Sequence, residues 1–234
     1  MSLIRTASWI HKWLALIVGV QIPFWLASGV FFAVFPVERV RSEHRIAMHE
    51  PVPLDRAALA SAAELPTLMP EQPLRVSFER AVTGEPVAIA EFAERAPVLI
   101  DLAQGAIVSP ISAETAQRIA QTYVADAPDV RAVESVTESS PEYRGPLPAW
   151  RVSFADAEGL AVYVAADTGR VGARRSDLWR AFDAMWALHI MDWRDRENFN
   201  HGLMILASVL SLVVVLSGFI LIPYRLGWLR RRAR

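Results

Sequence analysis

Two long runs without a charged residue constrain this chain more than any other feature. The runs cover residues 13–35 and 202–224, and most of their side chains are apolar. About 20 apolar residues are enough to cross the hydrocarbon core of a bilayer as a helix. The first run is too long for a signal peptide, and an arginine-containing segment follows it instead of a small-residue cleavage site. The sequence therefore predicts two retained transmembrane helices.

The charges of the two tails indicate how these helices are oriented. The tails hold seven basic residues and no acidic one: Arg5, Lys12, Arg225, Arg230, Arg231, Arg232 and Arg234. Basic residues favour the cytoplasmic side, so we expect both termini in the cytoplasm and the central domain in the periplasm of a bacterial inner membrane. We divide the chain into a tail (1–12), helix 1 (13–35), a periplasmic domain (36–175), an amphipathic interfacial helix and turn (176–198), helix 2 (199–224) and a basic tail (225–234).

The central domain alternates between helical and strand patterns. Residues 55–64 and 112–125 are predicted helices, the second beginning at Ser112. Alternating apolar residues predict strands after each of them, at 74–80, 86–92, 97–102, 130–137, 149–155 and 160–166. Tight turns are expected at residues 103–105 and 167–169, which both end in glycine. The expected fold is α+β, with one helix followed by antiparallel strands, and this arrangement occurs twice.

Composition excludes several kinds of function. The formal net charge is −1, so a general attraction to nucleic acid is not expected. The chain has no Cys, which excludes disulfides, thiolate metal sites and iron–sulfur clusters. No Gly-x-Gly-x-x-Gly motif is present, so a nicotinamide or flavin domain is not expected either.

Three of the five histidines lie at positions that suggest a cofactor. His11 precedes the first run, His201 precedes the second, and His189 shares the apolar face of the predicted helix at 176–193. Gly29 follows His11 at a distance that places it near the opposite face of the membrane, level with His201, and Gly218 is expected level with His11. Glycine lets a flat macrocycle approach the backbone closely.

This pattern predicts a b-type heme with two axial histidines. Each chain has only His11 at the inner level, so a pair of ligands there requires a homodimer with four membrane helices. At the outer level His189 and His201 are both candidates, and the number of hemes, one or two per dimer, stays open. His44 and His49 lie in a polar stretch and are interpreted as solvated or loosely metal-binding.

The chain resembles two related families of sequence. Residues 112–175, with PAWRVSF and VYVAADTGRV, resemble a PepSY domain, and residues 54–111 resemble a degenerate second copy. HKWLALIVG near the start, with WALHIMDW and HGLMILASVL near the end, resembles the PepSY-associated transmembrane family. Larger members of this family have about four membrane helices in one chain. With two predicted spans, this chain is more similar to the family's short VciB-like branch of ferric reductases.

The resemblance implies an inner-membrane ferric-iron reductase that passes electrons through heme b to periplasmic Fe(III). It carries over His11 and His189 as heme residues, and His201 less directly. Asp192, Asp195 and Glu197 are candidate Fe(III) ligands because hard oxygen donors suit this ion. The electron donor is a quinol or another redox partner. The alternatives are a non-enzymatic PepSY module that binds or inhibits a partner protein, and an accessory subunit of iron or siderophore uptake.

Overall fold

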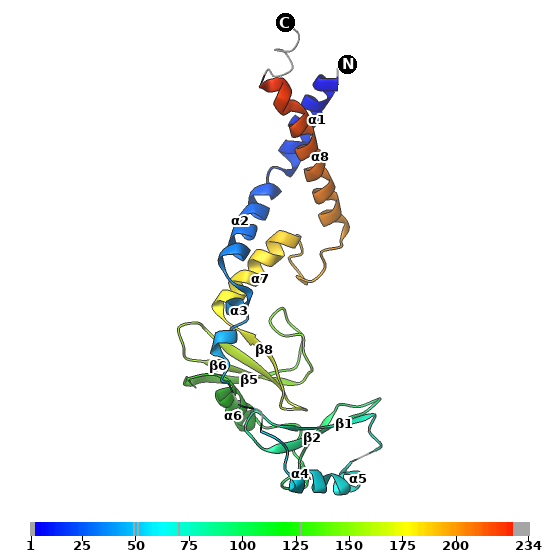
Figure 1. Ribbon diagram of the computed structural model, residues 1–234, viewed down its shortest axis with the longest axis vertical. Coiled ribbons are helices and arrows are strands. Elements are labelled where there is room, and N and C mark those ends of the chain that lie inside the picture. Colours follow the sequence, from blue (N-terminus) through cyan, green and yellow to red (C-terminus); the bar gives the residue numbers. More distant parts are fainter. Residues whose placement is uncertain (1–2, 49, 51, 70, 127, 227–234) are drawn as a thin grey trace. The chain divides into compact units, whose positions relative to one another are not determined.

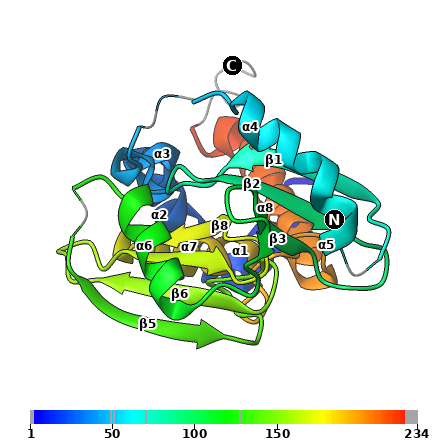
Figure 2. The same ribbon diagram turned by 90° about the horizontal axis from the view of Figure 1, so that it is seen from below.

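The computed structural model describes residues 3–48, 50, 52–69, 71–126 and 128–226, and the chain divides into two compact units. Residues 37–180 form an α+β unit. The segments up to residue 36 and from residue 181 onward form a helical unit. Figure 1 shows the helices and strands of both units, and Figure 2 shows them from below.

The α+β unit contains two four-stranded antiparallel sheets, each preceded by helix. The helices α4 (Arg56–Ala60), η2 (Ser61–Glu64) and α5 (Leu65–Leu68) precede the first sheet, which consists of β1 (Arg75–Arg80), β2 (Pro86–Glu91), β3 (Val98–Asp101) and β4 (Ala106–Ile107). Helix α6 (Ala113–Tyr123) precedes the second, which consists of β5 (Val130–Val136), β6 (Ala149–Phe154), β7 (Ala161–Ala165) and β8 (Val171–Arg175). Two short helices, α3 (Val37–Val40) and η1 (Glu43–Arg45), begin the unit.

The predicted repetition of a helix and antiparallel strands is therefore confirmed. In both sheets the strands are hydrogen-bonded in sequence order, β1-β2-β3-β4 and β5-β6-β7-β8. Ser112 caps α6, as predicted, because its side chain accepts a hydrogen bond from the N–H of Thr115. The glycines that end the two predicted turns, Gly105 and Gly169, both have positive φ, which residues with a Cβ adopt at a cost.

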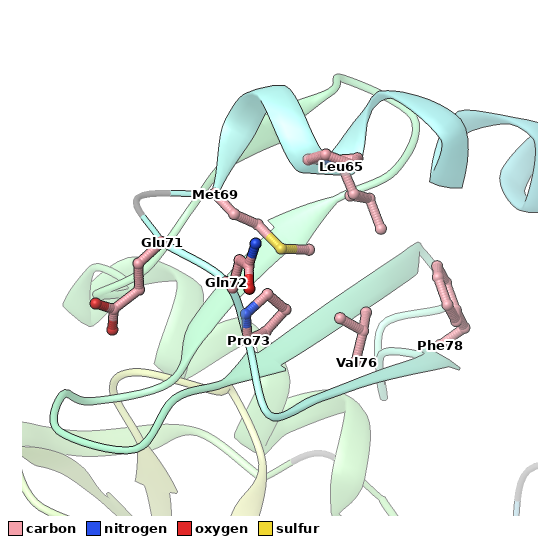
Figure 3. Close-up of a pocket in the computed structure, with 8 residues that line it drawn as sticks. Leu65, Met69, Glu71, Gln72, Pro73, Val76 and Phe78 are labelled. Atoms are coloured by element: carbon pink, nitrogen blue, oxygen red, sulfur yellow. The ribbon is translucent and has the colours of Figure 1, made fainter.

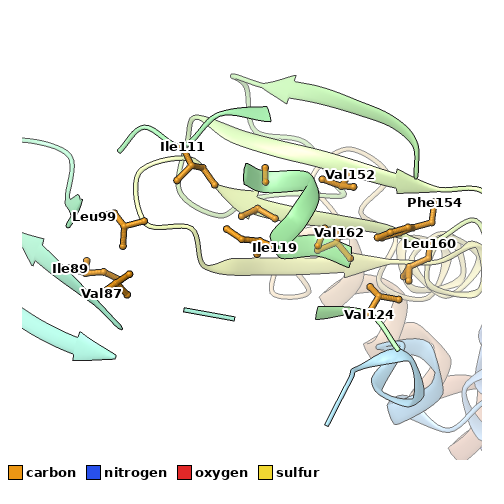
Figure 4. Packing of buried hydrophobic residues seen from close by; sticks show 13 residues of the cluster. Val87, Ile89, Leu99, Ile111, Ile119, Val124, Val152, Phe154, Leu160 and Val162 are labelled. Atoms are coloured by element: carbon orange, nitrogen blue, oxygen red, sulfur yellow. The ribbon is translucent and has the colours of Figure 1, made fainter. Parts of the chain in front are cut away.

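One apolar core joins the two sheets. Figure 4 shows Val87, Ile89 and Leu99 of the first sheet in the same cluster as residues of α6 and of the second sheet, among them Ile119 and Val162. A second cluster fills the space between the first sheet and α4–α5, and it includes Ala88, Ala90, Ile100 and Leu65. The central strands β2 and β3 are thus buried on both faces, which explains their near-continuous apolar sequence.

The helical unit contains α1 (Leu3–Val18), α2 (Gln21–Val34), the larger part of α7 (Asp177–Ile190) and α8 (Gly202–Arg225). α1 packs against α8, and the two helices run antiparallel, so the beginning of α1 lies beside the end of α8 (Figure 1). Many large apolar side chains of α8 are exposed, including Leu206, Val209 and Phe219. Such a surface suits contact with lipid.

The first apolar run is not the single helix 13–35 that the sequence analysis predicts. Helix α1 begins at Leu3, and a bend of 61° separates α1 from α2. Pro23 explains the break, because proline lacks an N–H and its ring clashes with the carbonyl four residues earlier, here that of Gly19. Gly19 suits the bend, since a Cβ at this position would lie 2.4 Å from the Ala15 carbonyl oxygen.

Within the described residues, residues 202–223 of α8 form one helix long and apolar enough to cross a membrane, and α1 with α2 count as a second only if the bent pair is one span. The tail at 225–234 is described only for its first two residues, and His49 lies outside the described residues.

Candidate functional site

His11 of α1 contacts α8 close to Gly218. Its Nδ1 atom lies 3.0 Å from the carbonyl oxygen of Val214 and 3.1 Å from the Oγ atom of Ser217. A carbonyl oxygen can only accept a hydrogen bond, so Nδ1 carries the proton. A Cβ on Gly218 would lie 3.2 Å from Cε1 of the His11 ring. The glycine therefore leaves space for the imidazole ring.

His189 of α7 makes the equivalent contact with α2. Its Nδ1 atom lies 2.8 Å from Oγ of Ser28, a fully buried residue. The hydroxyl of Ser28 donates to the carbonyl oxygen of Phe24 at 2.7 Å. The same hydroxyl also lies 3.1 Å from the carbonyl oxygen of Trp25. With its single proton directed to a main-chain carbonyl, the hydroxyl accepts from His189, and we assign the hydrogen to Nδ1. No hydrogen bond to Nε2 of His11 or His189 occurs within the described residues.

Aromatic side chains surround His189 and fix α7 on α2. The ring of Phe32 lies 5.6 Å from the imidazole in an edge arrangement, and the ring of Trp186 stacks parallel to it at 6.4 Å. Phe182 packs against Phe32 at 4.7 Å between ring centroids. The indole N–H of Trp25 donates to the carbonyl of His189 at 2.7 Å, which satisfies one of the free carbonyls at the end of α7.

His201 has a different environment, in which both ring nitrogens are used. Its Nε2 atom lies 2.8 Å from the carbonyl oxygen of Ile190, so this nitrogen is protonated. Its Nδ1 atom accepts from the N–H of Met204 at 3.3 Å. His201 immediately precedes α8 and thus acts as its N-cap, a role that side chains with a nearby acceptor can take.

Helical rise predicts that His11 lies level with Gly218 and that His201 lies level with Gly29, and the structure agrees with only the first pair. Gly218 lies against His11, as the rise predicts. Gly29 has open space where a side chain would be, and the residue before it, Ser28, contacts His189 and not His201. The sequence contained a signal for this arrangement, because Ser28-Gly29 and Ser217-Gly218 repeat the same dipeptide.

Of the acidic residues considered for Fe(III), Asp192 is used by its own loop. Asp192 accepts backbone N–H groups from Asp195, Glu197 and Asn198, each at 3.1 Å, so its carboxylate organises the loop after α7. Burial opposes ionisation of Asp192, but these N–H donors prevail and lower its pKa to about 2. In the described part of the chain no three His, Cys, Asp or Glu side chains are placed to hold a metal ion.

Arg196 ties the same loop to α7. Its guanidinium pairs with the buried carboxylate of Asp183, and its carbonyl accepts the indole N–H of Trp186 at 3.1 Å. A buried carboxylate without a partner would be costly, so this pair holds the loop beside the aromatic residues around His189. The sequence analysis did not predict a role for Asp183 or Arg196. Asp183 is not part of the apolar face that drew attention to His189, and Arg196 lies beyond the end of α7.

Comparison with known proteins identifies one family. The model of the family described as the PepSY-associated TM region matches residues 8–234, almost the whole chain. No curated protein and no solved structure matches the chain.

Proposed function

The chain belongs to the PepSY-associated TM family, and from that premise we propose that this membrane-anchored PepSY protein holds heme b and reduces ferric iron on the periplasmic side of the inner membrane. A heme with two axial histidines would supply one-electron transfer, and Fe(III) would be its substrate. The electron donor would be a quinol or a redox partner protein.

The contacts of the Nδ1 atoms of His11 and His189 are the observation that carries this proposal. Histidines that bind a metal through Nε2 commonly donate the other ring N–H to a carbonyl or another acceptor, which fixes the tautomer and the ring orientation. In this assignment, Nδ1 of His11 donates to the carbonyl oxygen of Val214, and Nδ1 of His189 donates to the hydroxyl of Ser28. Both rings are therefore oriented by α8 and α2, and within the described residues their Nε2 atoms make no hydrogen bond, so these nitrogens would be the ones that hold a heme iron.

Two levels of ligation follow from the positions of these residues. His11 is held by α8 near Ser217, whereas His189 is held by α2 near Ser28. Each level offers one oriented histidine per chain, so a second chain would supply the other histidine of each heme site. We assign two hemes to a homodimer, with His11 of both chains at one level and His189 of both chains at the other. His201 is assigned to capping α8.

An absorption spectrum of the protein in mild detergent, oxidised and then reduced with dithionite, tests the cofactor. We expect a Soret band that sharpens and split visible bands after reduction, which are typical of a low-spin b-type cytochrome. Reoxidation by Fe(III) would then establish the reaction. A preparation that stays colourless when heme is supplied during expression would overturn the proposal and favour a module that binds a partner protein.

Histidine variants test the assignment of ligands. His11→Ala and His189→Ala should each lower the heme content by about half, because each removes one of two bis-histidine sites. His201→Ala and His44→Ala are the matched controls and should retain the wild-type heme content and spectrum. Loss of heme in His201→Ala, with no change in His189→Ala, would contradict the assignment at the second level.

A further inference from the structure

The outer edge of β1 offers main-chain groups that no strand uses. β1 is the terminal strand of the first sheet, and within the described residues it pairs only with β2. Ala81 donates its N–H to the carbonyl of Glu85, in the same register as the β1–β2 ladder. Since hydrogen bonds alternate along an antiparallel strand, the odd-numbered residues of β1 bond to β2, and Val76 and Phe78 present their N–H and C=O groups to the open edge.

An apolar cavity lies beside the same two residues. The cavity has a volume of about 550 Å³, and Val76 and Phe78 line it together with Leu65 and Met69 from the α5 region. Figure 3 shows these side chains around one hollow on the α5 side of β1. A strand added at this edge would direct every second side chain into the cavity, because residues opposite Val76 and Phe78 lie on the same face.

The other face of β1 carries a row of alternating charges. Arg75 pairs with Glu91 of β2 at 2.6 Å, and Glu79 pairs with Arg170 at 2.6 Å. In an antiparallel pair of two β1 strands centred on Ser77, Arg75 lies opposite Glu79 of the partner subunit. The two existing ion pairs would then join across the interface into a row of four charges of alternating sign, and opposite charges across strands are favourable.

The same register matches the apolar side chains. Val76 lies opposite the partner subunit's Phe78, so each Phe78 enters the cavity next to Val76 of the other chain. Phe78 is 36% exposed, which leaves apolar surface to bury. We propose that β1 is a dimerisation edge, where two copies of this chain pair antiparallel about Ser77 and join their first sheets into one eight-stranded sheet.

This inference rests on the proposed dimer of the helical units and adds the surface where the α+β units meet. Strand pairing of six residues buries less than the roughly 1,200 Å² that stable interfaces usually need. Two chains already associated through their membrane helices raise the effective concentration of the two β1 edges. A second copy fits better than an unrelated peptide, because the charges at residues 75 and 79 and the apolar pair at 76 and 78 are complementary to themselves.

Cysteine crosslinking tests the register, since the natural chain has no Cys. Arg75→Cys and Glu79→Cys chains with different tags are expressed together, oxidised in the membrane and separated without reductant. In the proposed dimer these two positions face each other with Cα atoms about 4.5 Å apart, within the range that disulfides bridge. Two chains that carry the same substitution would instead place their cysteines about 13 Å apart along the strands, too far for a disulfide. We expect a crosslinked band with both tags only when the two variants are mixed.

Each variant expressed alone is the matched control. A band from Arg75→Cys or Glu79→Cys alone that equals the band from the mixture would overturn the proposed register, and so would the absence of a band from the mixture. Because the mixed pair keeps one unmodified Arg75–Glu79 contact, loss of charge does not explain a negative result.

The heme spectrum of the same preparation separates this inference from the proposed function. Heme without the mixed crosslink would overturn the β1 interface alone. The mixed crosslink without heme would overturn the cofactor alone and leave the dimer edge established.

Discussion

At the scale of single residues, a serine hydroxyl lies against Nδ1 of each of the two histidines. Ser217 lies 3.1 Å from Nδ1 of His11, and Ser28 lies 2.8 Å from Nδ1 of His189. In the described structure, Ser28 is the only acceptor near Nδ1 of His189. Nδ1 of His11 has two acceptors nearby, Ser217 and the Val214 carbonyl. We therefore expect His189 to depend on its serine more strongly than His11 does.

The first prediction compares serine variants by heme affinity. Ser28→Ala removes the only acceptor for the His189 N–H among the described residues and should weaken heme binding about 10-fold to 100-fold, the usual effect of losing an outer partner. Ser217→Ala should have a smaller effect, because Val214 remains. Ser211→Ala is the control, since the buried hydroxyl of Ser211 has no partner in the described structure. An equal loss in Ser211→Ala would show that the effect is structural.

A second prediction concerns the acid dependence of the α+β unit. Burial raises the pKa of Glu142, but hydrogen bonds from Arg180 and Tyr163 outweigh it and lower the pKa below its ordinary value. A lowered pKa stabilises the fold above the unfolded-state value and loses this contribution as pH falls through the folded-state value. Glu142→Gln should therefore cost about 1 kcal/mol at pH 7, since the contact is partly solvated.

The measurement is urea unfolding, in detergent, of the wild type and of Glu142→Gln at pH 7 and at pH 3. The difference in unfolding free energy should shrink at pH 3, because this pH lies below the ordinary pKa of a glutamate and the unfolded chain then takes up the proton. Glu134→Gln, whose ion pair with Arg151 is more exposed, is a suitable control and should change stability less. A difference for Glu142→Gln that stays constant with pH would contradict the assigned role of its charge.

At the scale of elements, the bend between α1 and α2 separates the two histidine contacts. α1 positions His11 on α8, and α2 positions Ser28 on His189. A bend of 61° lies between them, at the break that contains Gly19. The direction of the chain at Gly19 therefore determines whether both contacts form together.

The third prediction compares glycine variants by thermal stability in detergent. Gly19→Ala should lower the melting temperature, because its Cβ would lie 2.4 Å from a main-chain oxygen that cannot move away independently. Gly29→Ala should leave stability unchanged or slightly higher, since Gly29 has open space and alanine favours helix by about 1 kcal/mol. The reverse order of the two variants would contradict this account of the bend.

At the scale of the whole molecule, the two sheets depend on one shared core. Ile89 is fully buried in the cluster that contains α6 and the second sheet, and Ile100 is fully buried in the cluster beneath α4 and α5. Both residues belong to the first sheet, on strands β2 and β3. They provide a matched pair that distinguishes the shared core from the local one.

The fourth prediction uses hydrogen exchange of the full chain. Ile89→Ala and Ile100→Ala should each destabilise by about 2–4 kcal/mol, the usual cost of a buried isoleucine truncation. In Ile89→Ala the faster exchange should extend to β6 and β7 of the second sheet, since their residues pack in the same cluster. In Ile100→Ala it should remain in the first sheet. Equal exchange in the second sheet for both variants would contradict a shared core.

Local residue patterns determined the elements of the α+β unit, because side chains alternate along a strand and follow a 3.6-residue period in a helix. Ser112, the glycine-ended turns and the two runs of strands were predictable for this reason. The bend at Gly19 was predictable too, since Pro23 lies four residues after it, although the uncharged run by itself predicts one helix. The family was evident from motifs near both ends of the chain.

Only the tertiary structure decided which partner each histidine has. His201 and His189 look equivalent in sequence, yet the carbonyl of Ile190 and the N–H of Met204 occupy both nitrogens of His201, while Ser28 orients His189. Asp192 likewise binds N–H groups of its own loop. Hydrogen bonds between distant segments depend on how the chain packs, and no periodicity of the sequence records them. For the same physical reason, the open edge of β1 and the cavity beside it became visible only in the folded chain.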